Sequence, residues 1–195
     1  MITFDYPEGA TPIDLDEAGG LRLTHITTRG ELDRWEQDNI IQALAWINRT
    51  RPSDILDELF IKDLHRRMFG AVWKWAGHFR HSDKNIGGPW HQVPTSVRNL
   101  CDNVRLWMEL RDESPDQMAV RFHHRLVSIH PFANGNGRHA RLMTDVLLEH
   151  ILQRPRFTWG SEDLCKPGDA RRRYIMALHA ADQQNYSPLV EFVRT

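Results

Sequence analysis

The sequence is poor in cysteine, in charge of one sign and in long hydrophobic runs. Only two cysteines, Cys101 and Cys165, occur among 195 residues. Two cysteines are too few for a disulfide framework, so we expect reduced thiols and a cytoplasmic protein. No apolar run approaches the ~18 residues that span a bilayer. The acidic N-terminus also lacks the basic start of a signal peptide, so we expect no membrane association.

The charges are almost balanced, with 25 Lys and Arg against 26 Asp and Glu and a net charge of -1. This balance argues against direct nucleic-acid binding, which needs a basic surface. A hydrophobic share of 41% over this length suits one domain with a core. A zinc site built from histidines such as His123, His124, His130 and His139 is disfavoured, because no metal-ligand spacing is present.

Apolar residues recur at helical spacing along most of the chain, which predicts an all-α fold of seven or eight helices. Residues 1–24 lack such a period and are expected to form an extended N-terminal arm before a domain over 25–195. The expected helices cover about 27–49, 55–70, 97–110, 115–129, 137–152, 168–183 and 187–194. The glycines and prolines of residues 77–94 exclude a long helix there, and a small β-hairpin is expected near 86–93.

The segment from His130 to Arg141 carries the chemistry. Pro131 ends the preceding helix, and Gly135 and Gly137 permit a close approach to the backbone where the next helix begins. The first amides of a helix point outward at the positive end of its dipole, and this arrangement suits a phosphate. Arg138 and Arg141 share one helix face over that pocket, and His130 lies just upstream as a candidate base.

Each of these features alone is commonly structural. A Gly- and Asn-rich turn before a helix is often punctuation, a single histidine is often solvated, and two arginines three residues apart often form a solvated face. Their combination within twelve residues is what favours a phosphate-binding site.

The same segment resembles the signature of the Fic family, H-x-F-x-[D/E]-G-N-G-R-x-x-R, at seven of its eight specified positions. The segment Trp75-Ala76-Gly77 with Arg80 is similar to the family's "WAG…R" stretch. With Thr24–Ile40 included, residues 24–192 look most like the branch called mobile mystery protein B. The resemblance implies a Fic-type helical domain with a small hairpin flap.

The resemblance implies transfer of AMP from ATP to a hydroxyl group of a target protein. His130 would take the proton of that hydroxyl, and Phe132 would be structural. Gly135, Asn136 and Gly137 would cradle the phosphates, with Arg138 and Arg141 on the β- and γ-phosphates. The flap holding the target peptide would include Lys84, Asn85, Ile86, Gly87 and Gly88. The branch further implies a helix-turn-helix regulator as a partner.

One position departs from the signature, since Asn134 stands where the family has the Asp or Glu that binds Mg²⁺. An amide oxygen can coordinate Mg²⁺ but brings no charge. Losing a charge–charge interaction at ~4 Å in an effective dielectric of ~20 costs ~4 kcal/mol. The alternatives to AMP transfer are therefore a catalytically degenerate nucleotide-binding regulatory module and a phosphotransferase like that of the Doc branch.

An N-terminal segment resembles the family's inhibitory helix, [S/T]-x-x-x-E-[G/N], at Thr27 and Glu31. The implied role of Glu31 is to pair with Arg141 and block the γ-phosphate site. The alternative is structural: Thr27 or Thr28 caps the helix over about 27–49 and Glu31 complements its dipole.

Overall fold

The structure is a computed structural model that describes residues 15–23, 25–26, 28–162, 164 and 167–195. Residues 1–14, Thr27 and Cys165, which the sequence analysis singled out, lie outside the described residues. The described helices are α1 (Leu15–Ala18), α2 (Arg29–Thr50), α3 (Glu58–Phe69), α4 (Val93–Leu110), α5 (Pro115–Ile129), α6 (Asn136–Val146), α7 (Asp169–Asp182) and α8 (Ser187–Phe192). The all-α prediction is confirmed, although part of the expected extended arm is the single helical turn α1.

Local sequence signals set the starts of α2, α3 and α5. Thr28 accepts a bond from the Glu31 amide while the Glu31 side chain bonds back to the Thr28 amide, which is a capping box. Ser114 and Gln117 form a second capping box before α5, and Asp57 caps α3. These caps satisfy amides that lack an intrahelical partner.

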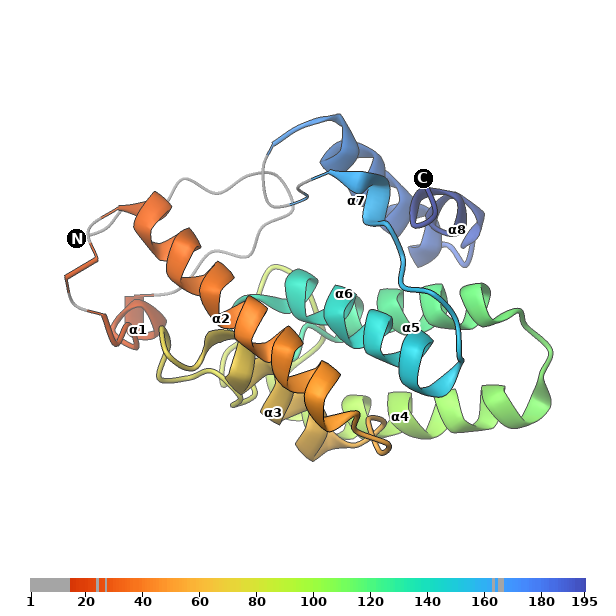
Figure 1. Cartoon of the computed structure of the whole chain (residues 1–195), viewed down its shortest axis with the longest axis horizontal. Coiled ribbons are helices and arrows are strands. Elements are labelled where there is room, and N and C mark those ends of the chain that lie inside the picture. The colour runs from red at the N-terminus through yellow and green to blue at the C-terminus, as the bar shows by residue number, and fades with distance from the viewer. Residues whose placement is uncertain (1–14, 24, 27, 163, 165–166) are drawn as a thin grey trace.

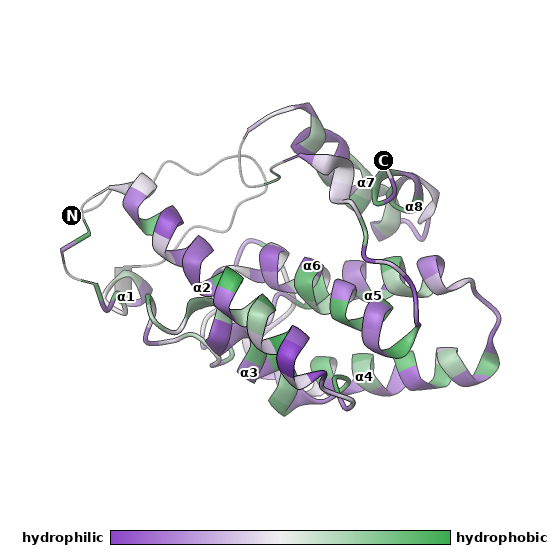
Figure 2. Ribbon diagram, viewed as in Figure 1, coloured by the Kyte–Doolittle hydropathy of each residue, from purple (hydrophilic) through white to green (hydrophobic). Residues whose placement is uncertain are grey.

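Helices α2 to α6 enclose the larger core. Helix α3 packs against α2, α4 and α6, and α5 packs against α4 and α6 (Figure 1). Each helix carries a hydrophobic stripe and a hydrophilic one, which alternate along the ribbons in Figure 2. The largest fully buried side chains of this core include Trp73, Phe69, Phe122 and Phe132.

A smaller hydrophobic cluster joins α5 to α7 and α8 at one end of the molecule (Figure 1). The chain reaches this end through a π-helical turn, η2 (Leu147–Ile151), and a 3₁₀ turn, η3 (Trp159–Ser161). No helix in the part of the chain that the structure describes is long and apolar enough to cross a membrane.

The hairpin expected near 86–93 is wrong. No strand occurs over these residues, which form turns followed by the 3₁₀ helix η1 (Trp90–Gln92). Two side chains hold the segment in place of a strand partner: Asp83 accepts from the Trp90 amide at 2.7 Å and Arg80 donates to the Gly88 carbonyl at 2.5 Å. Helix α4 also begins earlier than expected, because Pro94 lies in its first turn, where proline is tolerated.

Asp145 of α6 links the two hydrophobic clusters. Its Oδ1 accepts from the Trp159 indole at 3.0 Å and from the Phe157 amide at 3.3 Å. Burial outweighs these bonds and raises the pKa of the Asp145 carboxyl to about 7.

This shift predicts a pH-dependent stability. An unfolded Asp has a pKa of about 3.9, so the folded protein binds the extra proton and loses stability as pH rises from about 4 to about 7. Asp145→Asn keeps the Oδ1 acceptor without the charge. We expect the variant to lose this pH dependence in urea unfolding at pH 5 and pH 8, whereas the exposed Asp102→Asn should not. If the free energy of unfolding of Asp145→Asn changes between pH 5 and pH 8 as much as that of the wild type, the raised pKa of Asp145 is not the cause.

Candidate active site

His130 lies at the end of α5 in a left-handed conformation, with φ at 53°. Its side chain is turned inside the protein, and the residue is only 5% exposed. Burial lowers the pKa of the imidazole to about 4, against the opposing effect of a hydrogen bond with the Val127 backbone. The ring is therefore neutral at pH 7 and able to accept a proton.

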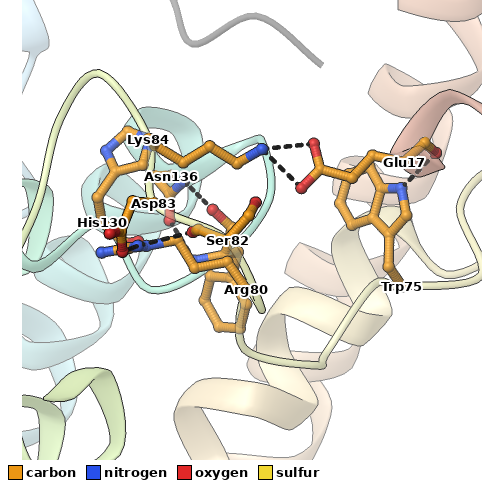
Figure 3. A network of polar contacts seen from close by, with 9 residues as sticks. Glu17, Trp75, Arg80, Ser82, Asp83, Lys84, His130 and Asn136 are labelled. Atoms are coloured by element: carbon orange, nitrogen blue, oxygen red, sulfur yellow. Dashed lines mark hydrogen bonds and ion pairs between the residues drawn. The ribbon is translucent and has the colours of Figure 1, made fainter. Parts of the chain in front are cut away.

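Arg80 fixes the main chain around His130. Its side chain is buried and donates to the carbonyl oxygens of His130 (2.8 Å), Ser82 (2.9 Å) and Gly88 (2.5 Å). The Arg80 amide also donates to the Pro131 carbonyl at 2.9 Å. The close view in Figure 3 shows Arg80 between Ser82 and His130. Sequence reasoning found Arg80 only as part of a family resemblance and gave it no role.

The segment expected to form the flap lies against His130. A Cβ atom on Gly87 would come within 3.1 Å of the His130 Cβ and 2.9 Å of the Ile129 carbonyl oxygen, and its φ is +99°. Only glycine fits both the space and the conformation. Lys84 is directed away, toward α1, where it pairs with Glu17 at 2.7 Å (Figure 3). Gly87 therefore approaches His130 closely, and Gly88 is joined to His130 through Arg80, which bonds the carbonyls of both.

The loop after His130 is held by hydrogen bonds between its own residues. The Asn136 side chain accepts from the Phe132 amide at 2.9 Å and donates to the Phe132 carbonyl at 2.8 Å. These two bonds give the Asn136 side chain a structural part in the loop, and its expected role at the phosphates stays a prediction. Phe132 is fully buried and stacks on His65 with ring centroids 3.7 Å apart, as its predicted anchoring role requires.

His65 supports the loop from α3. Its Nδ1 accepts from the Gly77 amide at 3.0 Å, so the proton lies on Nε2, which donates to the Asn134 carbonyl at 3.1 Å. Burial holds the pKa of His65 well below its ordinary value. Sequence reasoning did not identify His65, because nothing near it in the chain indicates contact with residues 132–134.

Gly135 allows α6 to begin where it does. A Cβ atom there would come within 2.8 Å of two Phe69 ring carbons, and its φ of +78° disfavours other residues. As the N-cap residue it has no side chain to bond the first amides of α6. The N-terminus of this helix therefore presents positive backbone dipoles beside Arg138 and Arg141.

The two arginines have different surroundings. Arg138 bonds Glu36 of α2 with Nη1 2.5 Å from the carboxylate, and its guanidinium lies 4.8 Å from the centre of the Phe69 ring. The Glu36 carboxylate is 3% exposed and also accepts from the Trp73 indole at 2.6 Å. Arg141 lies over Tyr174 of α7, 5.9 Å from the ring centre.

Helix α2 thus reaches the site through Glu36, which the sequence analysis missed. Glu31, the residue singled out there, bonds the amide and hydroxyl of Thr28 at 3.1 and 3.0 Å. That contact supports the capping alternative, and an inhibitory role for Glu31 stays a prediction. The spacing of Trp35, Ile40 and Leu44 predicts the helix but not which carboxylate is buried at an arginine 102 positions away.

The residues that the structure describes do not offer Mg²⁺ a set of charged ligands. The Asn134 side-chain oxygen is neutral and accepts from the Gly135 amide at 2.7 Å. Nowhere among the described residues do three His, Cys, Asp or Glu side chains gather as ligands. Because Mg²⁺ favours anionic oxygen, the site would have to rely on phosphate oxygens and water to bind it.

Comparison with known proteins gives three consistent findings. The profile of the Fic/DOC family matches residues 55–148. The protein adenylyltransferase Fic of Drosophila melanogaster is 30% identical over 158 residues, which cover 77% of this chain and 30% of that protein. The chain therefore spans about a third of the length of the curated relatives it matches.

Solved structures match in fold. The N-terminal Fic domain of Bep8 from Bartonella sp. 1-1C superposes with a TM-score of 0.69 at 16% identity, over 90% of both chains. BepC from Bartonella tribocorum, solved with bound AMPPNP, has a TM-score of 0.67 at 17% identity, over 97% of this chain and 93% of that one.

The buried contact between Glu36 and Arg138 predicts strong energetic coupling. In a double-mutant cycle of Glu36→Ala and Arg138→Ala, we expect a coupling of about 2 kcal/mol, because each single change leaves a buried charge without its counter-ion. Chemical denaturation measures all four proteins. The matched control is the exposed pair Asp102 and Arg105, whose coupling should be below about 0.5 kcal/mol. Equal couplings in the two cycles would contradict the prediction.

Proposed function

Residues 55–148 of this chain are a Fic/DOC family domain, and from that premise we propose that the protein transfers AMP from ATP to a hydroxyl group of another protein. The observation that carries the proposal is the joining of three groups in one loop: the neutral His130, the uncapped N-terminus of α6 and the two arginines on its first turns. The adenylyltransferase name of the relatives and the AMPPNP bound in BepC support the same reaction.

His130 is proposed as the base. The hydroxyl oxygen of the target attacks the α-phosphorus of ATP, and its proton passes to the neutral imidazole. The bond from the α-phosphorus to the oxygen bridging it to the β-phosphate breaks, and pyrophosphate leaves. Because His130 must be neutral to act, this step is available above pH ~5 and is lost as pH falls through about 4.

The start of α6 is proposed as the phosphate site. Backbone amides of Gly135, Asn136 and Gly137 would meet phosphate oxygens, and Arg141 would balance the charge that builds on pyrophosphate. Arg138 would do the same from a position held by Glu36. This division needs no substrate contact from the Asn136 side chain, which is occupied within the loop.

Asn134 favours a second candidate function. A domain that binds ATP without transferring AMP would regulate a partner through its nucleotide state, and an uncharged metal position suits such a module. From the likeness to mobile mystery protein B, the proposed partner is a helix-turn-helix regulator. A Doc-like phosphotransferase is a further reaction open to the same residues.

Replacing His130 separates chemistry from binding. We expect His130→Ala to lose AMP incorporation from labelled ATP while its ATP affinity stays within a few-fold, because the imidazole meets the hydroxyl and not the phosphates. In the comparison variant Arg141→Ala, calorimetry should show ATP binding weaker by roughly 1.5–3 kcal/mol. Wild-type incorporation by His130→Ala would remove the proposed base.

Asn134→Asp distinguishes the weakened enzyme from the regulatory module. An added carboxylate should strengthen Mg²⁺-dependent ATP binding and raise AMP incorporation, by at least tenfold and at most about a thousandfold. Both proteins are compared over a range of Mg²⁺ concentrations, with Asn134→Gln as the uncharged control. If neither protein labels any target while both bind ATP, the regulatory module is the better account.

A further inference from the structure

A cleft of about 230 Å³ lies between the turn before α4 and the last turn of α5. Its polar lining comes from Gln92, Ser96, Arg125 and Ser128, and its apolar lining includes Val93 and Ile129. None of the described residues that line it is acidic. Among these residues the cleft is therefore a mixed polar and apolar surface whose one charged side chain, Arg125, is positive.

Three polar side chains in the cleft have no polar partner among the residues that the structure describes. Arg125, Gln92 and Ser96 make no side-chain hydrogen bond or ion pair with any residue that the structure describes. Ser128 differs, because its hydroxyl donates to the His124 carbonyl at 2.9 Å. One turn earlier on α5, Arg121 pairs with Glu113 at 2.7 Å. An arginine on this helix can therefore find an acidic partner, and Arg125 differs from Arg121 in this respect.

The cleft adjoins the catalytic histidine. Ile129 and Gly88, which line it, are the chain neighbours of His130 and of Gly87, where a Cβ atom would come within 3.1 Å of the His130 Cβ. Arg80 ties both sides, through the carbonyls of His130 and Gly88. A peptide whose hydroxyl reaches His130 would place side chains a few residues away over the cleft.

We propose that this cleft binds an acidic side chain, Asp or Glu, of the target protein close to the hydroxyl that is modified. A guanidinium bonds a carboxylate through two parallel N–H groups, and the amide of Gln92 and the hydroxyl of Ser96 add neutral donors. Val93 and Ile129 contact the methylene groups of the same side chain. The assignment to a substrate rests on the proposed transfer to a protein hydroxyl; the binding of an acidic peptide does not.

The test is an array of nine-residue peptides with a central Thr in an Ala and Gly background. In one series a single Glu occupies each of the positions around the Thr in turn. Matched series carry Gln or Lys at the same positions. Labelled protein is applied in the presence of AMPPNP. We expect Glu at one or two adjacent positions to retain roughly fivefold more protein than Gln, as suits a solvent-accessible ion pair strengthened by further donors.

Arg125→Glu should transfer the preference from Glu to Lys at the same positions. Arg125 is exposed, so this variant keeps the fold, which a thermal melt verifies. Arg49→Glu, an equal charge change at an exposed residue of α2, should retain the wild-type pattern. Equal retention of Glu and Gln peptides everywhere, or an unchanged Glu preference in Arg125→Glu, would overturn the proposal.

A second measurement distinguishes this proposal from the proposed function. The best Glu peptide and its Gln partner are incubated with the protein and labelled ATP. If the Glu preference appears on the array and no peptide takes up label, AMP transfer to peptides fails and the cleft assignment stands. If both peptides are labelled equally and bind equally, the transfer stands and the cleft assignment fails.

Discussion

The guanidinium of Arg80 is 2% exposed and bonds three main-chain carbonyls from two segments, residues 82–88 and His130. Burial lowers the pKa of this arginine, with Asp83 opposing the change. A buried charge without partners is costly, so neither segment can move without disturbing Arg80. The approach of Gly87 to His130 depends on this one side chain.

A second set of buried groups positions the start of α6, the proposed phosphate site. His65 holds the carbonyl of Asn134 and stacks on Phe132, while Phe69 leaves room at Gly135 for hydrogen alone. Glu36 then holds Arg138 from α2. Each contact joins segments that are distant in the chain, so the loop from His130 to Gly137 is held in one conformation before any ligand arrives. Such preorganisation is what phosphoryl-type transfer requires of a protein.

Sequence patterns predicted helices well where a local signal existed. The helix over 115–129 begins at a capping box and ends before Pro131, and both features are local to its ends. The hairpin prediction for residues 86–93 was wrong, because Gly and Pro indicate a turn but not whether strands pair beside it. There the competing bonds come from Arg80 and Asp83. The bonds from the Asn136 side chain to Phe132 were not predicted either, since they depend on the shape of the closed loop.

By itself the sequence determined the all-α class, most helix bounds, and the loop from His130 to Arg141 as the candidate site, because caps, periodicity and a contiguous motif are local properties. Only the tertiary structure decided which side chains surround that loop. Four of these side chains lie between 5 and 102 positions along the chain from the residues of the loop near which the fold places them: Glu36, His65, Arg80 and Arg125. Helix packing decides which residues surround a buried or cleft-lining charge, and no spacing along the chain encodes these neighbours.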